Sequence, residues 1–193
     1  MVVTEAVTDR ERVVEAADRL FYARGVQSVG MDAVRAEAGV PLKRLYAAFG
    51  SKDDLVVAVL EHRSRTWDEG VARASTGART PRERLLAVYD FLDGWFRSDD
   101  FRGCAFVNAY GELGGVSPAV AQAVRSQKLS FARYVDELVA ALGADRSLGA
   151  QLVLLAEGAQ TTAAITGADH VADHARTAAG VLIDAAVRPE PDA

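Results

Sequence analysis

Two cations and an aromatic residue stand close together in one short, glycine-bounded stretch of the chain. Residues 39–55 read GVPLKRLYAAFGSKDDL, with Lys43, Arg44 and Tyr46 on a short predicted helix and Lys52 where the next helix should begin. Lysine and arginine bind phosphate groups, and arginine also pairs with the edge of guanine in the major groove of DNA. We therefore interpret this stretch as a surface that meets a polyanion.

The distribution of charge along the chain agrees with this interpretation, although the formal net charge of the whole chain is −5. Residues 1–65 contain as many Lys and Arg as Asp and Glu, and the excess of acids lies in residues 66–193. Between residues 35 and 52, four cations stand against Glu37 alone. An acidic body would repel DNA everywhere except where this positive window faces it.

Other residue types capable of chemistry form weaker patterns. Asp90 and Asp93 lie three residues apart, but no nucleophile or oxyanion donor accompanies them, which favours a solvated helix edge over acid–base catalysis. His170 and His174 have the i, i+4 spacing of a helical metal site, but the sequence places no third ligand. We therefore expect no enzymatic activity, no cofactor and no metal.

Helical periodicity and capping signals predict an all-α chain of about nine helices. A capping box at Thr8 and Glu11 starts the first helix, and Gly25 ends it. Pro189 and Pro191 begin a tail that we expect to be disordered. The other helices are expected at residues 31–38, 41–48, 52–74, 81–97, 102–113, 118–142, 146–166 and 169–187.

Three short helices followed by longer ones predict two domains, residues 1–51 and residues 52–193, with Ser51 as the cap of the helix at the junction. The second and third helices are joined by a tight turn that contains Gly39 and Pro41. A short helix pair of this kind, with exposed cations on the second helix, is typical of a helix-turn-helix DNA-binding domain.

Residues 10–60 resemble the DNA-binding domain of the TetR family of transcriptional regulators, without a gap over about fifty residues. The stretches RGCAFVNAYGEL and QLVLLAEGAQTTAA resemble the family's C-terminal ligand and dimer domain more loosely. The residues that carry the resemblance are Ala16, Ala17, Leu20, Phe21, Gly25, Val34, Ala38, Gly39, Val40, Leu45, Tyr46, Phe49, Ser51, Lys52 and Leu55.

The resemblance implies a ligand-responsive regulator, a repressor that a small apolar or amphipathic effector releases from a near-palindromic operator. The candidate contacts to double-stranded operator DNA are Leu42, Lys43, Arg44, Tyr46, Lys52 and Arg35. Either Lys43 or Arg44 is expected to read a base, and Lys52 to bind phosphate at a helix N-terminus. Lys43 and Arg44 replace the glycine and threonine that are usual in the family, so the operator sequence cannot be inferred from other family members.

Aromatic residues gather in the larger domain, where they form either an effector cavity or plain core. The candidate pocket residues are Trp67, Tyr89, Trp95, Phe96, Cys104, Tyr110, Phe131 and Tyr134. For Cys104 a buried inert thiol is favoured over an oxidant sensor, because Arg102 is the one cation near it in the sequence.

Small residues in the last two long helices, 146–166 and 169–187, would leave an apolar face exposed in a monomer. The resemblance implies a homodimer through a four-helix bundle of these helices. No apolar run is long enough to span a bilayer, and a single cysteine fits a reducing compartment, so we expect a cytoplasmic protein with no membrane partner. The alternative is a helical small-molecule-binding protein whose DNA role is secondary or lost.

Overall fold

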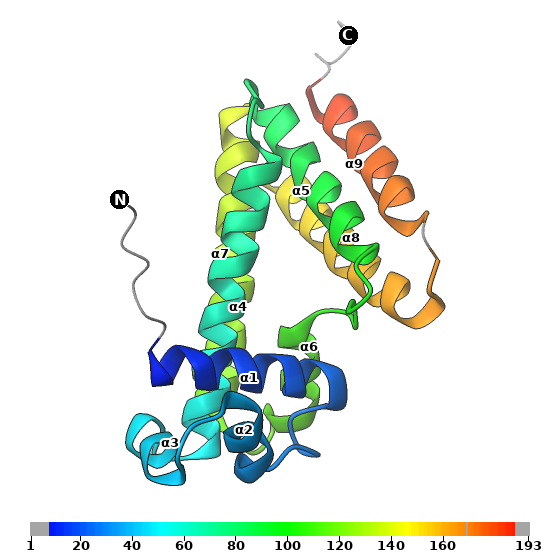
Figure 1. Ribbon diagram of the computed structural model, residues 1–193. Helices are drawn as coiled ribbons and strands as arrows, with labels where there is room; N and C mark the ends of the chain where they lie inside the picture. Colours follow the sequence, from blue (N-terminus) through cyan, green and yellow to red (C-terminus); the bar gives the residue numbers. More distant parts are fainter. Residues whose placement is uncertain (1–7, 169, 188–193) are drawn as a thin grey trace, which may run out of the picture. The chain divides into compact units, whose positions relative to one another are not determined.

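The computed structural model describes residues 8–168 and 170–187, and the regular structure within them is entirely α-helical (Figure 1). This confirms the predicted all-α class. The helices of the described residues are α1 (Asp9–Arg24), α2 (Met31–Ala38), α3 (Leu42–Ala48), α4 (Lys52–Ala74), α5 (Pro81–Phe96), α6 (Ala105–Leu113), α7 (Pro118–Ala141), α8 (Arg146–Thr166) and α9 (Val171–Val187).

The chain forms two compact units, and two helices contribute residues to both of them. The first unit consists of the described residues up to Arg65 together with Ala105–Arg125. The second consists of Thr66–Cys104 and the described residues from Ser126 onward. The helices α4 and α7 therefore continue from one unit into the other. The expected domain boundary at residue 52 stays a prediction. The first compact unit differs from the expected domain of residues 1–51, because it also contains α6.

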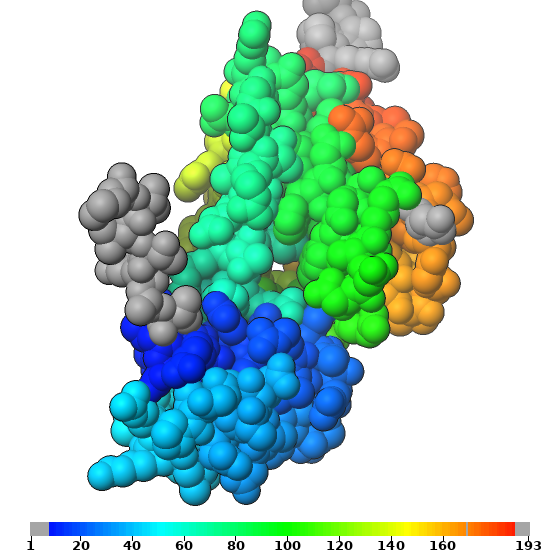
Figure 2. All heavy atoms as spheres, viewed as in Figure 1, coloured from blue at the N-terminus to red at the C-terminus, as the bar shows by residue number. Residues whose placement is uncertain are grey.

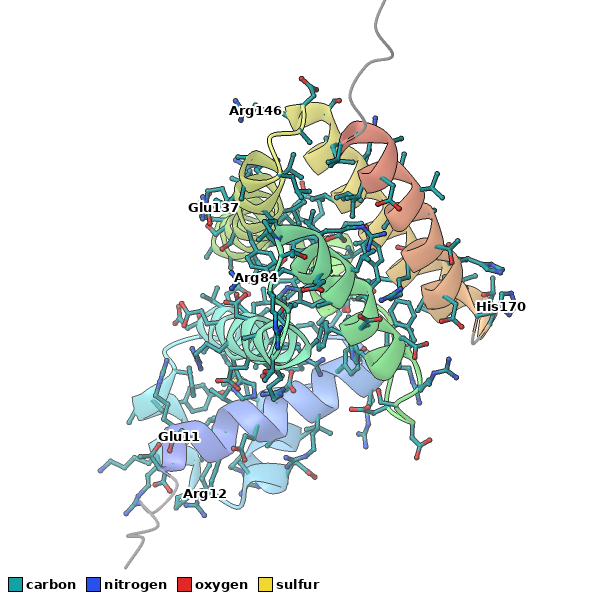
Figure 3. All side chains as sticks on the ribbon, turned by 90° about the horizontal axis from the view of Figure 1, so that it is seen from above. Glu11, Arg12, Arg84, Glu137, Arg146 and His170 are labelled. Carbon is teal, nitrogen blue, oxygen red and sulfur yellow. The ribbon has the colours of Figure 1, made fainter. Side chains whose placement is uncertain are left out.

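In the first unit, α1, α2 and α3 pack against one another through small and branched apolar side chains. The helix α1 starts at the predicted capping box, in which the Glu11 N–H donates to Thr8 Oγ1 at 3.2 Å and the Thr8 N–H donates to the Glu11 carboxylate at 2.8 Å. Figure 3 shows Glu11 and its neighbour Arg12 at this end of α1. Val34 of α2 and Leu45 of α3 are fully buried against this helix group.

The turn between α2 and α3 depends on glycine. Gly39 ends α2 with φ +64° and ψ +31°, a left-handed conformation that costs a residue with a side chain more than it costs glycine. Pro41 then stands before α3 in an extended conformation, and its carbonyl accepts the N–H of Leu45 at 3.1 Å. The helix α3 thus begins one residue later than expected. The predicted cap of α4 is confirmed, because the Asp54 N–H donates to Ser51 Oγ at 3.1 Å.

The second unit is built around α5, which packs against both α8 and α9. Two surface ion pairs accompany this packing, from Arg82 to Asp184 at 2.8 Å and from Arg176 to Asp90 at 2.5 Å. Asp90 therefore forms an ion pair between helices, in agreement with its interpretation as a helix edge. No helix in the described part of the chain is long and apolar enough to cross a membrane.

The start of α6 differs from the prediction by three residues. Gly103 has φ +82°, and a Cβ atom at this position would lie 2.9 Å from the Cβ of Ala164. The chain therefore reaches Ala105 before it becomes helical, and the expected start at residue 102 was wrong. The predicted start of α9 at Asp169 and the tail at Pro189 and Pro191 lie outside the described residues.

Candidate nucleic-acid interface and effector pocket

The helix α3 has one buried side and one exposed side. Leu45 is fully buried, and Phe49, just after the helix, is 2 % exposed. On the other side Leu42 is 46 % and Tyr46 51 % exposed, one helical turn apart. The structure therefore brings four of the six candidate DNA contacts together on one short exposed helix. These are Leu42, Lys43, Arg44 and Tyr46.

Arg44 forms an ion pair with the first residue of α1. Its Nη1 donates to Asp9 Oδ2 at 2.5 Å, and Asp9 also accepts from Arg12. The hydrogen bond from Arg44, and then the one from Arg12, lowers the pKa of the Asp9 carboxyl below its ordinary value. Because the pair lies in solvent, it is weak enough for a phosphate group to compete for Arg44.

Arg10 of α1 fixes the far end of α3. Its Nη1 donates to the carbonyl of Ala48 at 3.1 Å, and its guanidinium lies 4.4 Å from the centroid of the Phe49 ring. Sequence reasoning missed this contact because its partners lie 38 and 39 residues apart and no local pattern connects them. Arg10 therefore holds the C-terminal end of α3 from the neighbouring helix α1.

The other two candidate DNA contacts lie on α2 and α4. Arg35 is near Asp32 on its own helix, with 3.8 Å between Nε and Oδ1. Lys52 is the first residue of α4 and is half-buried, with its ammonium 5.9 Å from the centroid of the Phe21 ring. Both residues belong to the same unit as α3, and their contact with DNA stays a prediction.

A carboxylate from α6 holds the turn that leads into α2. Glu112 accepts the N–H of Val26 at 2.9 Å and the N–H of Gln27 at 2.7 Å. The side chain of Gln27 donates in return to the carbonyl of Glu112 at 2.8 Å. This contact joins segments more than eighty residues apart and has no signal in the sequence. It ties α6 to the helix-turn-helix within the first unit.

The second unit contains a hollow of about 480 Å³ between α4, α5 and α7, here called the α4–α5–α7 hollow. Its lining includes three of the predicted pocket residues, Trp67, Phe131 and Tyr134. Two charged residues of opposite sign, Asp68 and Arg84, also line it. Burial raises the pKa of the Asp68 carboxyl, and Figure 3 shows Arg84 on α5. The lining thus combines three aromatic rings and two charged groups with smaller apolar and hydroxyl side chains.

The remaining predicted pocket residues lie elsewhere. Tyr89 is core, because its hydroxyl donates to the carbonyl of Leu152 at 2.9 Å and burial raises the pKa of that hydroxyl. Trp95 and Phe96 join a ring cluster with Phe101, at centroid distances of 5.1 and 4.8 Å from it respectively. Tyr110 belongs to α6 in the first unit and is 51 % exposed.

Cys104 is buried, but it has a cation beside it that the sequence did not reveal. The Nζ of Lys128 lies 3.2 Å from its Sγ and donates to both carboxylate oxygens of Glu157 at 2.8 Å. Lys128 is 24 residues further along the chain, so the sequence alone indicated Arg102 as the one cation near Cys104. The thiol therefore lies next to an ion pair and does not line the α4–α5–α7 hollow.

His170 and His174 lie close together, with 4.9 Å between their ring centroids. Figure 3 shows His170 at the outer edge of the turn before α9. Across residues 8–168 and 170–187, no three His, Cys, Asp or Glu side chains come together in a way that could hold a metal ion.

A short helix pair joined by a left-handed glycine turn, with cations exposed on its second helix, defines a helix-turn-helix DNA-binding protein. Residues 13–59 match the family model of bacterial regulatory proteins, tetR family. A solved TetR-family transcriptional regulator from Streptomyces coelicolor is 32% identical with a TM-score of 0.86, and the alignment covers 93% of this chain and 96% of that one. The chain belongs to the TetR family of transcriptional regulators, which are DNA-binding proteins and not enzymes.

Further relatives agree with this family. A solved TetR-type regulator from Streptomyces avermitilis is 32% identical with a TM-score of 0.80, covering 93% of this chain and 98% of that one. The transcriptional activator FasR of Mycolicibacterium smegmatis is 34% identical over 44% of this chain. The regulator TtgR of Pseudomonas putida is 39% identical over 37% of this chain. The aligned part of this chain spans 40% of FasR and 33% of TtgR.

Proposed function

We propose that the chain is a ligand-responsive transcriptional regulator, a repressor that a small apolar or amphipathic effector releases from a near-palindromic DNA operator. The observation that carries this proposal is the exposed face of α3, which presents Lys43, Arg44 and Tyr46 to solvent. The opposite side of the helix is fixed in the core by Leu45 and by Phe49, which directly follows the helix. A regulator of this kind works where the DNA is, so the proposal places the protein in the cytoplasm.

The reading helix α3 is expected to enter the major groove. Arg44 then exchanges Asp9 for a phosphate group or for the O6 and N7 atoms of guanine, the bidentate pairing that arginine favours. Lys52 stands at the N-terminus of α4, where backbone N–H groups favour a phosphate. Arg10 holds the C-terminal end of α3 against α1 through its hydrogen bond to the carbonyl of Ala48.

A second copy of the chain is expected to cover the exposed side of α8 and α9. Leu154 and Ile165 on α8 are 72 % and 79 % exposed, and Val181 on α9 is 65 % exposed. Apolar side chains grouped on two neighbouring helices favour an interface with another protein surface. A homodimer of this kind presents two reading helices to half-sites about 34–36 Å apart, one turn of DNA.

The effector is expected in the α4–α5–α7 hollow. Aromatic walls beside Asp68 and Arg84 suit an amphipathic molecule, and the volume of about 480 Å³ is typical of small-molecule sites. The helix α4 carries Trp67 and Asp68 in this hollow and Lys52 at its first residue. An effector that shifts α4 would change the position of the reading helices and lower DNA affinity by about 1–3 kcal/mol.

Selection of bound sequences from a random DNA pool, followed by an anisotropy titration, tests the proposal. At least one of Lys43→Ala and Arg44→Ala should cost about 1–3 kcal/mol and relax sequence preference, while Lys52→Ala should weaken all sequences alike. Arg73→Ala, an exposed cation in the last turn of α4, is the matched control and should leave binding unchanged. A pool without any enriched sequence would contradict the proposal.

The alternative function is a helical small-molecule-binding protein whose DNA role is secondary or lost, and the α4–α5–α7 hollow is the feature that favours it. Saturable ligand binding in a protein that enriches no DNA sequence would support this alternative. A reporter gene under the selected operator then separates repression from activation, which matters because one relative is named an activator.

A further inference from the structure

A second hollow lies entirely within the first unit, between α1, α4 and α6, and is here called the α1–α4–α6 hollow. Figure 2 shows the surface hollowed beside α1 and α4. Its volume of about 470 Å³ lies within the range of roughly 300–1,000 Å³ that is typical of small-molecule sites. It shares no lining residue with the α4–α5–α7 hollow, and no residue of α3 lines it.

The walls of the α1–α4–α6 hollow are apolar over most of their extent. Phe21 of α1 and Val59 and Leu60 of α4 contribute large side chains, and Val107 and Ala109 contribute from α6. Phe21 is only 6 % exposed, so its ring is already part of the core. A ligand with an aromatic or aliphatic body would bury further apolar area against these side chains.

Three charged side chains line the hollow, and acids outnumber the single base. Arg63 Nε donates to Asp18 Oδ1 at 2.5 Å, and its guanidinium lies 3.8 Å from the centroid of the Tyr22 ring. Its charge is therefore already paired with a carboxylate and an aromatic face. Lys52 lies outside the wall, with its ammonium 5.9 Å from the Phe21 ring centroid.

Glu112 supplies the second carboxylate of the hollow. It accepts the N–H groups of Val26 and Gln27 at 2.9 and 2.7 Å. An ionised carboxylate has about four acceptor sites, so these two bonds leave acceptor capacity for a donor that approaches from the hollow. The formal charge of the lining, Asp18, Arg63 and Glu112 together, is negative, which favours a cation over an anion.

We propose that the α1–α4–α6 hollow binds a small amphipathic amine. The ammonium group donates to Glu112, and the apolar body packs against Phe21, Val59 and Leu60. The site goes beyond the proposed function, since it requires neither the DNA-contacting face of α3 nor the effector hollow of the second unit. Its ligand lies next to the carboxylate that holds the turn before α2, so binding is coupled to the geometry of that turn.

Three probes with one apolar body and different head groups test the ligand class on the full-length protein without DNA. They are 4-phenylbutylamine, 4-phenylbutanol and 4-phenylbutanoate. Heteronuclear NMR should show saturable shifts of the Val26 and Gln27 amide signals, because both N–H groups bond to Glu112. The amine should bind at least about tenfold more tightly than the carboxylate, with the alcohol between them.

A cavity-filling variant tests the location. Gly111 lines the hollow, and a Cβ atom there would meet no other heavy atom within 4 Å, so Gly111→Leu should fold and weaken amine binding at least about tenfold. Gly94→Leu is the matched control, because Gly94 is also an exposed helical glycine with open space around its Cβ and does not line the hollow. A thermal melt verifies that both variants fold.

Glu112→Gln provides a second measurement if Gly111→Leu does not fold. It removes the charge and keeps a carbonyl acceptor for one of the two backbone N–H groups, so the preference for the amine over the carboxylate should fall about tenfold. Three results would overturn the proposal: no saturable binding up to the solubility limit, equal affinity for amine and carboxylate, or shifts confined to the second unit. The outcome is independent of DNA binding, so the proposed function can fail separately.

Discussion

Arg44 does not extend freely from α3, because Asp9 holds its guanidinium at 2.5 Å. Asp9 is also the first residue of α1, and its carboxylate serves Arg12 as well. If Arg44 binds DNA as proposed, a phosphate must compete with the Asp9 carboxylate for it. In the proposed function, this ion pair orients Arg44 before DNA binds and lowers the net gain from its contact with DNA.

Asp9→Asn should raise DNA affinity roughly two- to fivefold, since Arg44 no longer has a competing carboxylate. An anisotropy titration at low salt against the selected operator measures the change. The gain should disappear in an Arg44→Ala background, and a gain of equal size there would show that Asp9 acts by general repulsion. Asp173→Asn removes one exposed acid from α9 in the other unit and should have no effect.

The pH dependence of the Arg44–Asp9 pair follows from the lowered pKa of Asp9. A carboxyl whose pKa is lower in the folded than in the unfolded state contributes stability above its unfolded pKa and loses it as the pH falls through the folded pKa. The Asp9 pair is therefore complete at neutral pH. The effect of Asp9→Asn on DNA affinity should stay constant between about pH 6 and 8, and a titration at both values measures it.

The helix α5 depends on its first turn in the same way as α1. Thr80 Oγ1 accepts the Glu83 N–H at 3.2 Å, and the Glu83 carboxylate accepts the N–H groups of Arg79 and Thr80 at 2.6 and 3.0 Å. These bonds lower the pKa of the Glu83 carboxyl. Because α5 packs against both α8 and α9, a frayed first turn would loosen the core of the second unit.

Thr80→Ala should therefore lower the free energy of unfolding by about 1 kcal/mol, the usual cost of losing an N-cap side chain. Urea denaturation followed by circular dichroism measures this change. Thr177→Ala is the control, because Thr177 is exposed within α9 and alanine favours a helix at least as well. A Thr80→Ala protein as stable as the wild type would show that the cap contributes nothing to α5.

Local signals made most of the helices predictable. The capping box at Thr8 and the glycine at 39 lie next to the helices they delimit, so the sequence located these ends correctly. Gly103 was misplaced inside a helix because its close approach to Ala164 is a tertiary contact. The exposed residues of α3 followed from periodicity in the same way.

The side chains that support the candidate sites could not be predicted either, because they also act through tertiary contacts. Arg10 meets Ala48, and Glu112 meets Val26 and Gln27, across 38 and more than eighty residues respectively. No spacing rule connects residues so far apart, and only packing brings them together. Aromatic composition likewise named eight pocket residues, whereas three of them line the α4–α5–α7 hollow.

Among the described residues, three of the four most exposed large apolar side chains lie on α8 and α9, although the chain is acidic overall. Leu154, Ile165 and Val181 are each more than 60 % exposed there. The net charge of −5 keeps identical chains apart at long range, so an apolar contact area must outweigh this repulsion if the chain dimerises. Dimerisation should therefore strengthen as salt screens the charge.

Leu154→Asp should shift the protein from dimer to monomer, because it places a charge in the proposed interface. Sedimentation velocity at several concentrations measures the shift. Val116→Asp is the matched control, since Val116 is 77 % exposed after α6 in the first unit and lies outside α8 and α9. A Leu154→Asp protein that sediments as the wild type does would exclude this face from the interface.

The bond between Glu112 and the turn before α2 has a consequence for protein engineering. Helix-turn-helix domains of related regulators can be exchanged to make hybrid proteins, and residue 52, the expected domain boundary, is an obvious place to join them. A hybrid joined there would keep Val26 and Gln27 but receive a foreign α6, and both N–H groups would lose their acceptor wherever that α6 has no acid at the position of Glu112. The transplanted part should therefore include residues 105–125, so that the graft consists of two separate pieces of chain.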